Sequence, residues 1–242
     1  MIHYLDLSLA TPAEDLACDE ALLEVLEEGS ESDGILRVWE PRQHFIAIGY
    51  ANRVSREVNL PFCQENQLPI LRRCTGGGAV LQGPGVLNYS LLLPMIPDSP
   101  FETISSTNAS ILGRHQNALA ALLNAPIEIR GQTDLAIGGL KFSGNSQRRR
   151  RRFLIFHGSF LLRLDFELME RSLPQPSKQP AYRLNRSHSE FLMNLKIPAS
   201  TLKTALQRVW SAASPWSEIP SRQISLLAKN KYCVEEWNFK FL

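Results

Sequence analysis

The sequence predicts an α/β domain in which helices pack on a sheet built largely from antiparallel strands. Two observations carry this prediction. Apolar residues recur at helical spacing after Thr11 and again over 103–123, the longest such pattern in the chain. Residues 127–164 instead alternate strand-like runs with glycine breaks, a pattern typical of antiparallel strands joined by tight turns.

The first helix has a recognisable beginning and end. Thr11 is a suitable N-cap, Pro12 occupies the first helical position, and Glu14 can close a capping box. Gly29 ends the apolar periodicity. Two β-rich runs follow, at 35–39 and 45–50, and the turn residues 41–43 between them predict a pair of strands joined by a turn.

The segment 71–93 combines two arginines, three consecutive glycines and a long apolar run that predicts a strand. Three glycines together suggest a backbone that a ligand approaches closely. Arg72 and Arg73, with Gly76 to Gly78, could bind phosphate, because guanidinium groups and bare N–H groups both match phosphate oxygens. The segment is neither a Walker A motif nor a dinucleotide-binding fingerprint, and a glycine-rich bulge flanked by surface arginines is the alternative.

Lys141 stands between glycines at 138–139 and 144, and strand alternation places it on the opposite face from its apolar neighbours. It could neutralise a carboxylate and a phosphate together, or it could be an exposed strand lysine. Asp134 could hold a magnesium ion or cap a turn. His157 has no partner in the sequence, and a packed histidine is the default interpretation.

Several segments carry weaker signals. Five arginines at 148–152 predict a solvated, mobile hairpin tip, with attraction of an acidic protein or polyphosphate as the alternative. The proline-rich segment 174–180 predicts a stiff linker or surface loop. Residues 199–210 and 224–238 predict two amphipathic helices that close over the sheet.

Composition bounds the class of protein. The 242 residues suit a single domain spanning 1–242, with a small helical subdomain over 198–242 as an alternative. A formal charge of +2 argues for neither nucleic acid nor membrane as partner. Four scattered cysteines indicate neither a disulfide framework nor a zinc site. A reducing cytoplasm fits these cysteines best, and because no apolar run reaches membrane-spanning length we expect a soluble protein.

The arginine-glycine segment and the Lys141 segment together resemble the lipoate-protein ligase A family, within the biotin/lipoate A/B protein ligase superfamily. The first signature covers 72–80 and 85–90. The second covers Thr133-Asp134, 139–144 and 157–161. The two signatures occur in the order and spacing of the family, and the similarity extends from the first helix to about Asp165.

The resemblance implies an α/β catalytic domain with a mixed, largely antiparallel sheet packed by helices. It implies that ATP and lipoic acid form an acyl-adenylate, with Mg²⁺ as cofactor, and that a carrier lysine then attacks. The implied partners are the lipoyl carrier domains of E2 subunits and the glycine cleavage H protein; a separate accessory chain for adenylation is an open alternative.

The resemblance assigns residues as follows. Lys141 is the catalytic residue, and Asp134 is also a metal ligand. The residues assigned to cofactor binding are Arg72, Arg73, Gly76, Gly77, Gly78, Ala79, Val80, Asp134 and Lys141. Those assigned to substrate binding are Gly77, Gly78, Asn88, Lys141, Ser143, Gly144 and His157.

The sequence departs from the family in two places. Leu81 and Gln82 stand where a histidine usually follows the glycines, and Thr133 replaces the usual asparagine. A thiol-dependent octanoyltransferase is the main rival, but it needs a cysteine near the lysine, and none occurs between Lys141 and Cys233. Cys74, inside the first signature, is expected to pack. ATP-dependent ligation is therefore favoured over acyl transfer, over biotin ligation and over non-catalytic lipoate binding.

Overall fold

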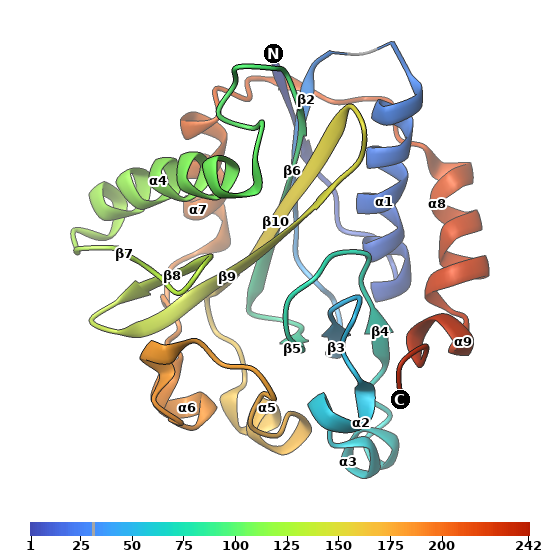
Figure 1. Ribbon diagram of the computed structural model, residues 1–242, viewed down its shortest axis with the longest axis vertical. Helices are drawn as coiled ribbons and strands as arrows, with labels where there is room; N and C mark the ends of the chain where they lie inside the picture. The colour runs from blue at the N-terminus through green and yellow to red at the C-terminus, as the bar shows by residue number, and fades with distance from the viewer. Residues whose placement is uncertain (31) are drawn as a thin grey trace.

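Two sheets organise the chain in the computed structural model, which describes residues 1–30 and 32–242 (Figure 1). The larger sheet has eight strands in the order β11-β1-β2-β6-β10-β9-β8-β7. These strands are β1 (Ile2–Asp6), β2 (Gly34–Trp39), β6 (Val86–Pro94), β7 (Glu128–Arg130), β8 (Asp134–Ile137), β9 (Leu140–Arg149), β10 (Phe153–Leu161) and β11 (Ser214–Pro215). The smaller sheet has the order β4-β3-β5, with β3 (Phe45–Ile48), β4 (Ile70–Arg72) and β5 (Val80–Gln82).

The predicted fold class is confirmed. Strand β1 pairs in parallel with both β2 and β11, whereas the pairs from β2 through β6, β10, β9 and β8 to β7 are antiparallel. The large sheet is therefore mixed and largely antiparallel. The glycine-separated runs of 127–164 form β7 to β10, as their turn residues predict.

Helices cover both faces of the large sheet (Figure 1). Helix α1 (Pro12–Glu28) begins with the predicted capping box, ends at Gly29, and shares a core with α8 (Ser221–Leu227) on one face. Helix α4 (Ile104–Leu123) and helix α7 (Ala199–Val209) bury their apolar residues against the other face. A third core joins the small sheet to four short helices: α2 (Val54–Glu57), α3 (Leu60–Glu65), α5 (Phe166–Ser172) and α6 (His188–Phe191).

The predicted pairing of 35–39 with 45–50 is wrong. Strand β2 lies inside the large sheet between β1 and β6, whereas β3 lies inside the small sheet between β4 and β5. Each strand therefore has two strand neighbours of its own, and each is buried along its whole length. The turn between them carries the chain from one sheet to the other.

The C-terminal residues depart from the prediction in one respect. Residues 224–238 are not one helix: α8 ends at Leu227, a π-helical turn spans Ala228–Tyr232, and α9 (Glu235–Asn238) follows. Residues after Pro198 contribute to both cores that cover the large sheet, and β11 extends that sheet. None of the helices in the described part of the chain is long and apolar enough to cross a membrane.

The arginine run at 148–152 is held to the protein rather than free in solvent, contrary to the prediction. The Arg148 guanidinium lies 3.0 Å from the Glu20 carboxylate, and Arg149 donates to two backbone carbonyls. The Glu27 carboxylate accepts the backbone N–H groups of Arg151, Arg152 and Phe153. An acceptor from α1 therefore fixes the hairpin tip, which sequence spacing did not reveal.

Candidate active site

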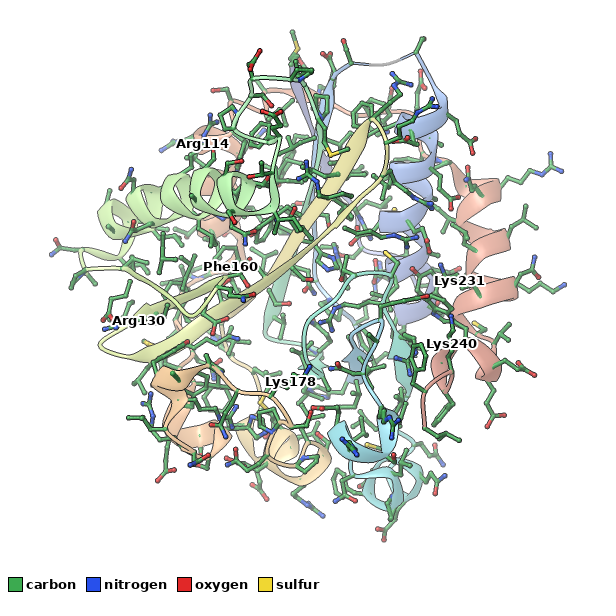
Figure 2. All side chains as sticks on the ribbon, viewed as in Figure 1. Arg114, Arg130, Phe160, Lys178, Lys231 and Lys240 are labelled. Carbon is green, nitrogen blue, oxygen red and sulfur yellow. The ribbon has the colours of Figure 1, made fainter. Side chains whose placement is uncertain are left out.

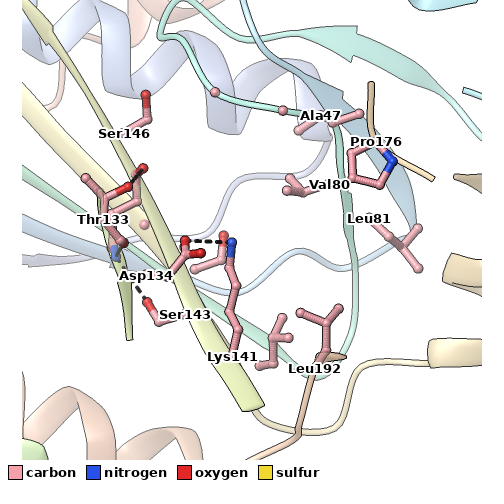
Figure 3. Close-up of a pocket in the computed structure, with 18 of the residues that line it drawn as sticks. Ala47, Val80, Leu81, Thr133, Asp134, Lys141, Ser143, Ser146, Pro176 and Leu192 are labelled. Carbon is pink, nitrogen blue, oxygen red and sulfur yellow. Dashed lines mark hydrogen bonds and ion pairs between the residues drawn. The ribbon is translucent and has the colours of Figure 1, made fainter. Parts of the chain in front are cut away.

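A cavity of about 600 Å³ opens between the two sheets. One wall comes from Arg73 and from residues 77–82, in the glycine loop and strand β5, and we call the segment 73–82 the glycine-loop wall. The opposite wall, residues 134–144 of β8 and β9, carries Lys141 and Asp134 and is called the lysine wall. Figure 3 shows Lys141 and Asp134 facing Val80 and Leu81 across this space. Two segments 60 or so positions apart in sequence are thus brought together, as the two signatures led us to expect.

Lys141 is oriented by an ion pair. Its Nζ lies 2.8 Å from Asp134 Oδ1, and both side chains are partly exposed to the cavity, at 25% and 12%. The Tyr182 hydroxyl donates to the other oxygen, Asp134 Oδ2, at 2.9 Å. Burial, followed by the Asp134 charge, raises the pKa of Tyr182, so the phenol stays a donor at neutral pH. Asp134 therefore fixes the position of the Lys141 ammonium group, and Tyr182 fixes the orientation of the Asp134 carboxylate.

The local backbone allows this lysine to lie along its strand. Asp134 is paired with Gly144, while Lys141 is three residues earlier on β9, beyond a register shift. The lysine side chain must therefore run past Gly144 to reach its partner. A Cβ at Gly144 would lie only 2.7 Å from Lys141 Nζ, which explains the glycine in the second signature.

Every nitrogen of the Arg73 guanidinium donates a hydrogen bond to the glycine loop or to strand β3. The guanidinium donates to the carbonyl oxygens of Ala47, Gly76 and Gly78 and to Thr75 Oγ1, at 2.6 to 3.2 Å. Burial lowers the pKa of Arg73 to about 10, which leaves it charged at neutral pH. The carbonyl groups of Gly76 and Gly78 in the glycine loop point inward, toward the Arg73 guanidinium. Gly77 adopts a φ of +89°, and a Cβ there would lie 2.7 Å from Arg73.

Arg72 does not line the cavity, contrary to its assignment as a cofactor-binding residue. Its guanidinium points to the C-terminal segment and donates to the carbonyls of Trp237 and Asn238, as well as to those of Gly49, Tyr50 and Asn52. Neighbouring residues of a strand face opposite sides, so the two arginines could not both face one ligand. Sequence reasoning treated them as a pair, whereas each organises a different part of the backbone.

His157 has two partners, contrary to its isolated appearance in sequence. Its Nε2 lies 2.7 Å from Thr75 Oγ1 in the glycine loop, and its Nδ1 lies 3.5 Å from Asp19 Oδ2 in α1. With Nδ1 protonated toward the carboxylate, Nε2 accepts from the threonine hydroxyl. The histidine thus ties the glycine loop to a buried charge on the first helix.

Asp19 belongs to a buried triad with Asp15 and Arg37. Each carboxylate lies 2.6 Å from the Arg37 guanidinium. Burial raises the pKa of Asp15 to about 6, despite the arginine. Burial acts in the same direction on Asp19, but Arg37 and then His157 outweigh it and hold the pKa of Asp19 below its ordinary value. Asp19 is therefore the carboxylate that carries the negative charge toward His157.

A closed ring of hydrogen bonds stands where the family's histidine is missing. Gln82 donates to Ser159 Oγ at 2.7 Å, Ser159 donates to Asn88 Oδ1 at 2.6 Å, and Asn88 donates to Gln82 Oε1 at 2.9 Å. The ring joins β5 of the small sheet to β6 and β10 of the large sheet. Gln82 and Ser159 were missed in the sequence, although Gln82 occupies the signature position that departs from the family.

The cavity gathers most of the expected residues. Arg72 and Gly76 lie outside its lining, and the others line it: Arg73, Gly77, Gly78, Ala79, Val80, Asn88, Asp134, Lys141, Ser143, Gly144 and His157. The proline-rich segment also contributes, through Pro176, Lys178, Gln179 and Pro180. Sequence reasoning treated that segment only as a loop. Its prolines preset an extended backbone but do not indicate what it covers.

The residues present do not form a magnesium site around Asp134. Both of its oxygens already accept from donors, Lys141 and Tyr182. It is the single carboxylate among the described residues that line the cavity, and no cluster of three acidic, histidine or cysteine ligands occurs within 1–30 and 32–242. Mg²⁺ prefers several oxygen ligands in octahedral geometry. Asp134 therefore acts as the partner of Lys141 and Tyr182 rather than as a magnesium ligand.

None of the four cysteines, all within the described residues, lines the cavity. Burial raises the pKa of Cys18 to about 12 and that of Cys63 to about 11, and it also raises the pKa of Cys74. Thiols of this kind are poor nucleophiles at neutral pH. Cys233 is exposed in the C-terminal segment. Cys74 is buried, as predicted.

Comparison with known proteins agrees with this architecture. A solved structure of a bi-partite lipoate protein ligase from Thermoplasma acidophilum, described with its E2 lipoyl domain, superposes with a TM-score of 0.83 at 23% identity, over 99% of this chain and 96% of that one. The fold is therefore that of a lipoate-ligase catalytic domain. Residues 11–209 match the family described as the lipoyl protein ligase A/B catalytic domain, and the chain belongs to that family.

Two curated relatives align along nearly the whole chain. Octanoyltransferase LipM of Brevibacillus brevis is 26% identical over 98% of each protein. Lipoate-protein ligase A subunit 1 of Thermoplasma acidophilum is 27% identical over 98% of this chain and 96% of its own. The chain is thus an enzyme of a family that contains both ligases and acyl transferases.

Proposed function

We propose that this enzyme is an ATP-dependent lipoate-protein ligase, which forms lipoyl-AMP and transfers the lipoyl group to a carrier lysine in the cytoplasm. One observation carries the proposal: the cavity presents a fixed lysine opposite a glycine loop, and none of the four cysteines lines it. An acyl-cysteine mechanism needs a thiol within reach of the acyl group. Adenylation needs only cations and donors placed around a phosphate.

The glycine-loop wall offers donors for that phosphate. The N–H groups of Gly77 and Gly78, both in the cavity lining, donate to no protein acceptor in the described ranges 1–30 and 32–242. The neighbouring carbonyls of Gly76 and Gly78 are turned toward Arg73 instead. Backbone N–H groups held in this way are suited to an α-phosphate without the energetic cost of rearrangement.

The proposed reaction has two steps. An oxygen of the lipoate carboxylate attacks the α-phosphorus, and the bond to pyrophosphate breaks. The uncharged amine of the carrier lysine then attacks the acyl carbon, AMP leaves, and the amine releases its proton to solvent. Lys141 contacts the acyl carbonyl and the α-phosphate in both steps, so its charge offsets the charge that develops there. Asp134 and Tyr182 keep its Nζ in place.

Carrier domains of E2 subunits and the glycine cleavage H protein are the proposed acceptors. The Thermoplasma structure is described as a bi-partite ligase with its E2 lipoyl domain. A separate accessory chain is therefore the first component to add if this chain alone does not activate lipoate. Octanoyl transfer without adenylation is the second candidate, and it is favoured by the full-length similarity to octanoyltransferase LipM.

Mass spectrometry of an apo carrier domain separates the two functions. The carrier is incubated with the protein and either ATP plus lipoate or octanoyl carrier protein. Ligation predicts a lipoyl mass increase in the first mixture, dependent on ATP. An octanoyl mass increase in the second mixture alone would establish the transferase instead. Replacing all four cysteines by serine should leave ligation intact in a variant that folds.

A further inference from the structure

One lysine that lines the cavity belongs to neither the glycine-loop wall nor the lysine wall. Among the described residues, four lysine and arginine side chains line the cavity: Arg73, Lys141, Lys178 and Arg183. Arg73 donates to loop carbonyls, and Lys141 is paired with Asp134. Arg183 is buried and donates to the Arg186 carbonyl. Lys178 is exposed and has no hydrogen bond or ion pair with any residue in 1–30 or 32–242.

The backbone around Lys178 is fixed on both sides. The hydroxyl of Ser177 donates to the Glu57 carboxylate in α2, and the Gln179 amide donates to Asn185 Oδ1 at 2.6 Å. Pro176 and Pro180 restrict the backbone further. Figure 3 shows Pro176 beside Val80, and Figure 2 shows Lys178 in the region of the view between β5 and α5. The lysine is therefore held at the cavity while its ammonium group remains available.

We propose that Lys178 binds the β- and γ-phosphates of ATP and the pyrophosphate that leaves. This inference rests on the proposed ligase function and assigns one residue of the same site. A triphosphate carries about four negative charges, and both arginines of the first signature are committed to carbonyls. Lys141 is assigned to the α-phosphate. Lys178 is the remaining cation of the described cavity lining that can meet the terminal phosphates without breaking an existing bond.

The chemistry of the first step gives this position a purpose. As the carboxylate oxygen bonds to the α-phosphorus, the bridging oxygen takes the electron pair of the broken bond and leaves with pyrophosphate. No proton is transferred. Negative charge therefore accumulates on the leaving group, and an ammonium group placed there stabilises it. The second step involves no pyrophosphate, so Lys178 has no part in it.

Measuring the two steps separately tests the assignment. ATP–pyrophosphate exchange reports the first step, and transfer from presynthesised lipoyl-AMP to an apo carrier reports the second. In Lys178→Ala we expect exchange to fall about tenfold, mainly through a higher KM for ATP, because a charge-assisted contact at an exposed position is lost. Transfer from lipoyl-AMP should keep its wild-type rate. Lys178→Arg should restore most of the exchange, and added salt should weaken the wild-type advantage.

Lys229→Ala is the matched control, because Lys229 is also an exposed lysine but does not line the cavity. Unchanged exchange in Lys178→Ala would overturn the assignment. A higher KM for the carrier with normal exchange would also overturn it, and would make Lys178 a docking residue for the carrier. Absence of exchange in the wild-type protein, with any accessory chain present, would instead refute adenylation itself.

Discussion

The glycine-loop wall and the lysine wall differ in how much of their polar chemistry is already used inside the protein. On the glycine-loop wall, every nitrogen of the buried Arg73 guanidinium donates to the loop or to β3. On the lysine wall, Lys141 makes one ion pair and remains a quarter exposed. The hydrogen bonds of Arg73 fix the backbone of the glycine loop, whereas the Lys141 ammonium group can leave Asp134 to contact a ligand. A cation in a signature motif can therefore be structural, while a distant lysine keeps part of its side chain accessible from the cavity.

Lys141→Ala should cause the largest change, on the lysine wall. We expect lipoyl-adenylate formation to fall by about a thousandfold or more, because a charge aimed at the α-phosphate is lost. The melting temperature should change little, because the side chain is partly exposed and lies outside the cores. Pyrophosphate release and a thermal melt measure both. Undiminished activity in the folded variant would remove Lys141 from the site.

Arg73→Ala should show the opposite profile, on the glycine-loop wall. We expect a loss of about 3 to 5 kcal/mol in the free energy of unfolding, because the buried carbonyl of Ala47 and the part-buried ones of Gly76 and Gly78 lose their donor. Urea denaturation measures the loss. A variant with normal stability and only a raised KM for ATP would show that Arg73 binds the nucleotide after all, and the contrast between the walls would fail.

The stability that Asp19 contributes beneath the glycine-loop wall, through Arg37 and His157, should depend on pH. Asp19→Asn should cost about 3 kcal/mol at pH 7, because it breaks a buried ion pair with Arg37. The pKa of Asp19 is lowered in the folded protein, so its contribution to stability is present above the ordinary carboxylate pKa and is lost as the pH falls through the lowered one. The deficit of the variant should therefore shrink in strong acid, as measured by denaturation across pH.

Asp15→Asn is the matched comparison. Burial raises the pKa of Asp15 to about 6, so the charged form of this carboxylate weakens the fold above that pH. The variant should lose less stability at pH 7 than Asp19→Asn does. An equal loss would show that the two carboxylates share Arg37 evenly, and a larger loss would show that Asp15 is its main partner.

Gly144→Ala should have the smallest effect, confined to the lysine wall. The added Cβ would approach Lys141 Nζ to 2.7 Å and push the flexible end of the lysine away from Asp134. We expect activity to fall about tenfold with little change in stability, since misplacement of a reacting group costs rate rather than fold. Gly113→Ala in α4 is the control, because a Cβ there meets nothing within 4 Å. Full activity of Gly144→Ala would show that the ion pair does not position the lysine.

The sequence predicted those elements of the fold that depend on interactions between residues close together in the chain. The capping box at Thr11 and Glu14 and the glycine-broken strands around Lys141 depend on neighbours in sequence, and both are present. The separation of 35–39 from 45–50 depends on which strands compete for each edge, which no turn residue encodes. The packing of the arginine run against α1 likewise depends on Glu20 and Glu27, more than 120 positions away.

The candidate site divides in the same way. Lys141 and Asp134 were found because glycines and a charged residue stand together in a short motif. The different partners of Arg72 and Arg73 follow from strand alternation, a signal that the sequence does contain. Lys178 and Gln82 reach the cavity through tertiary packing, and Tyr182 reaches Asp134 in the same way; their local sequence gives no sign of it.

The attachment of Arg72 to the C-terminal segment has a consequence for how the protein is made. The Arg72 side chain bonds to the Trp237 carbonyl across 165 positions of sequence, and the Trp237 indole donates back to the Arg72 carbonyl. During synthesis, strand β4 leaves the ribosome long before these partners exist. The glycine-loop wall must therefore wait for the far end of the chain before its backbone is set. A bulky fusion after Leu242 would slow maturation of the site, because it would delay the docking of Trp237 and Asn238 on Arg72.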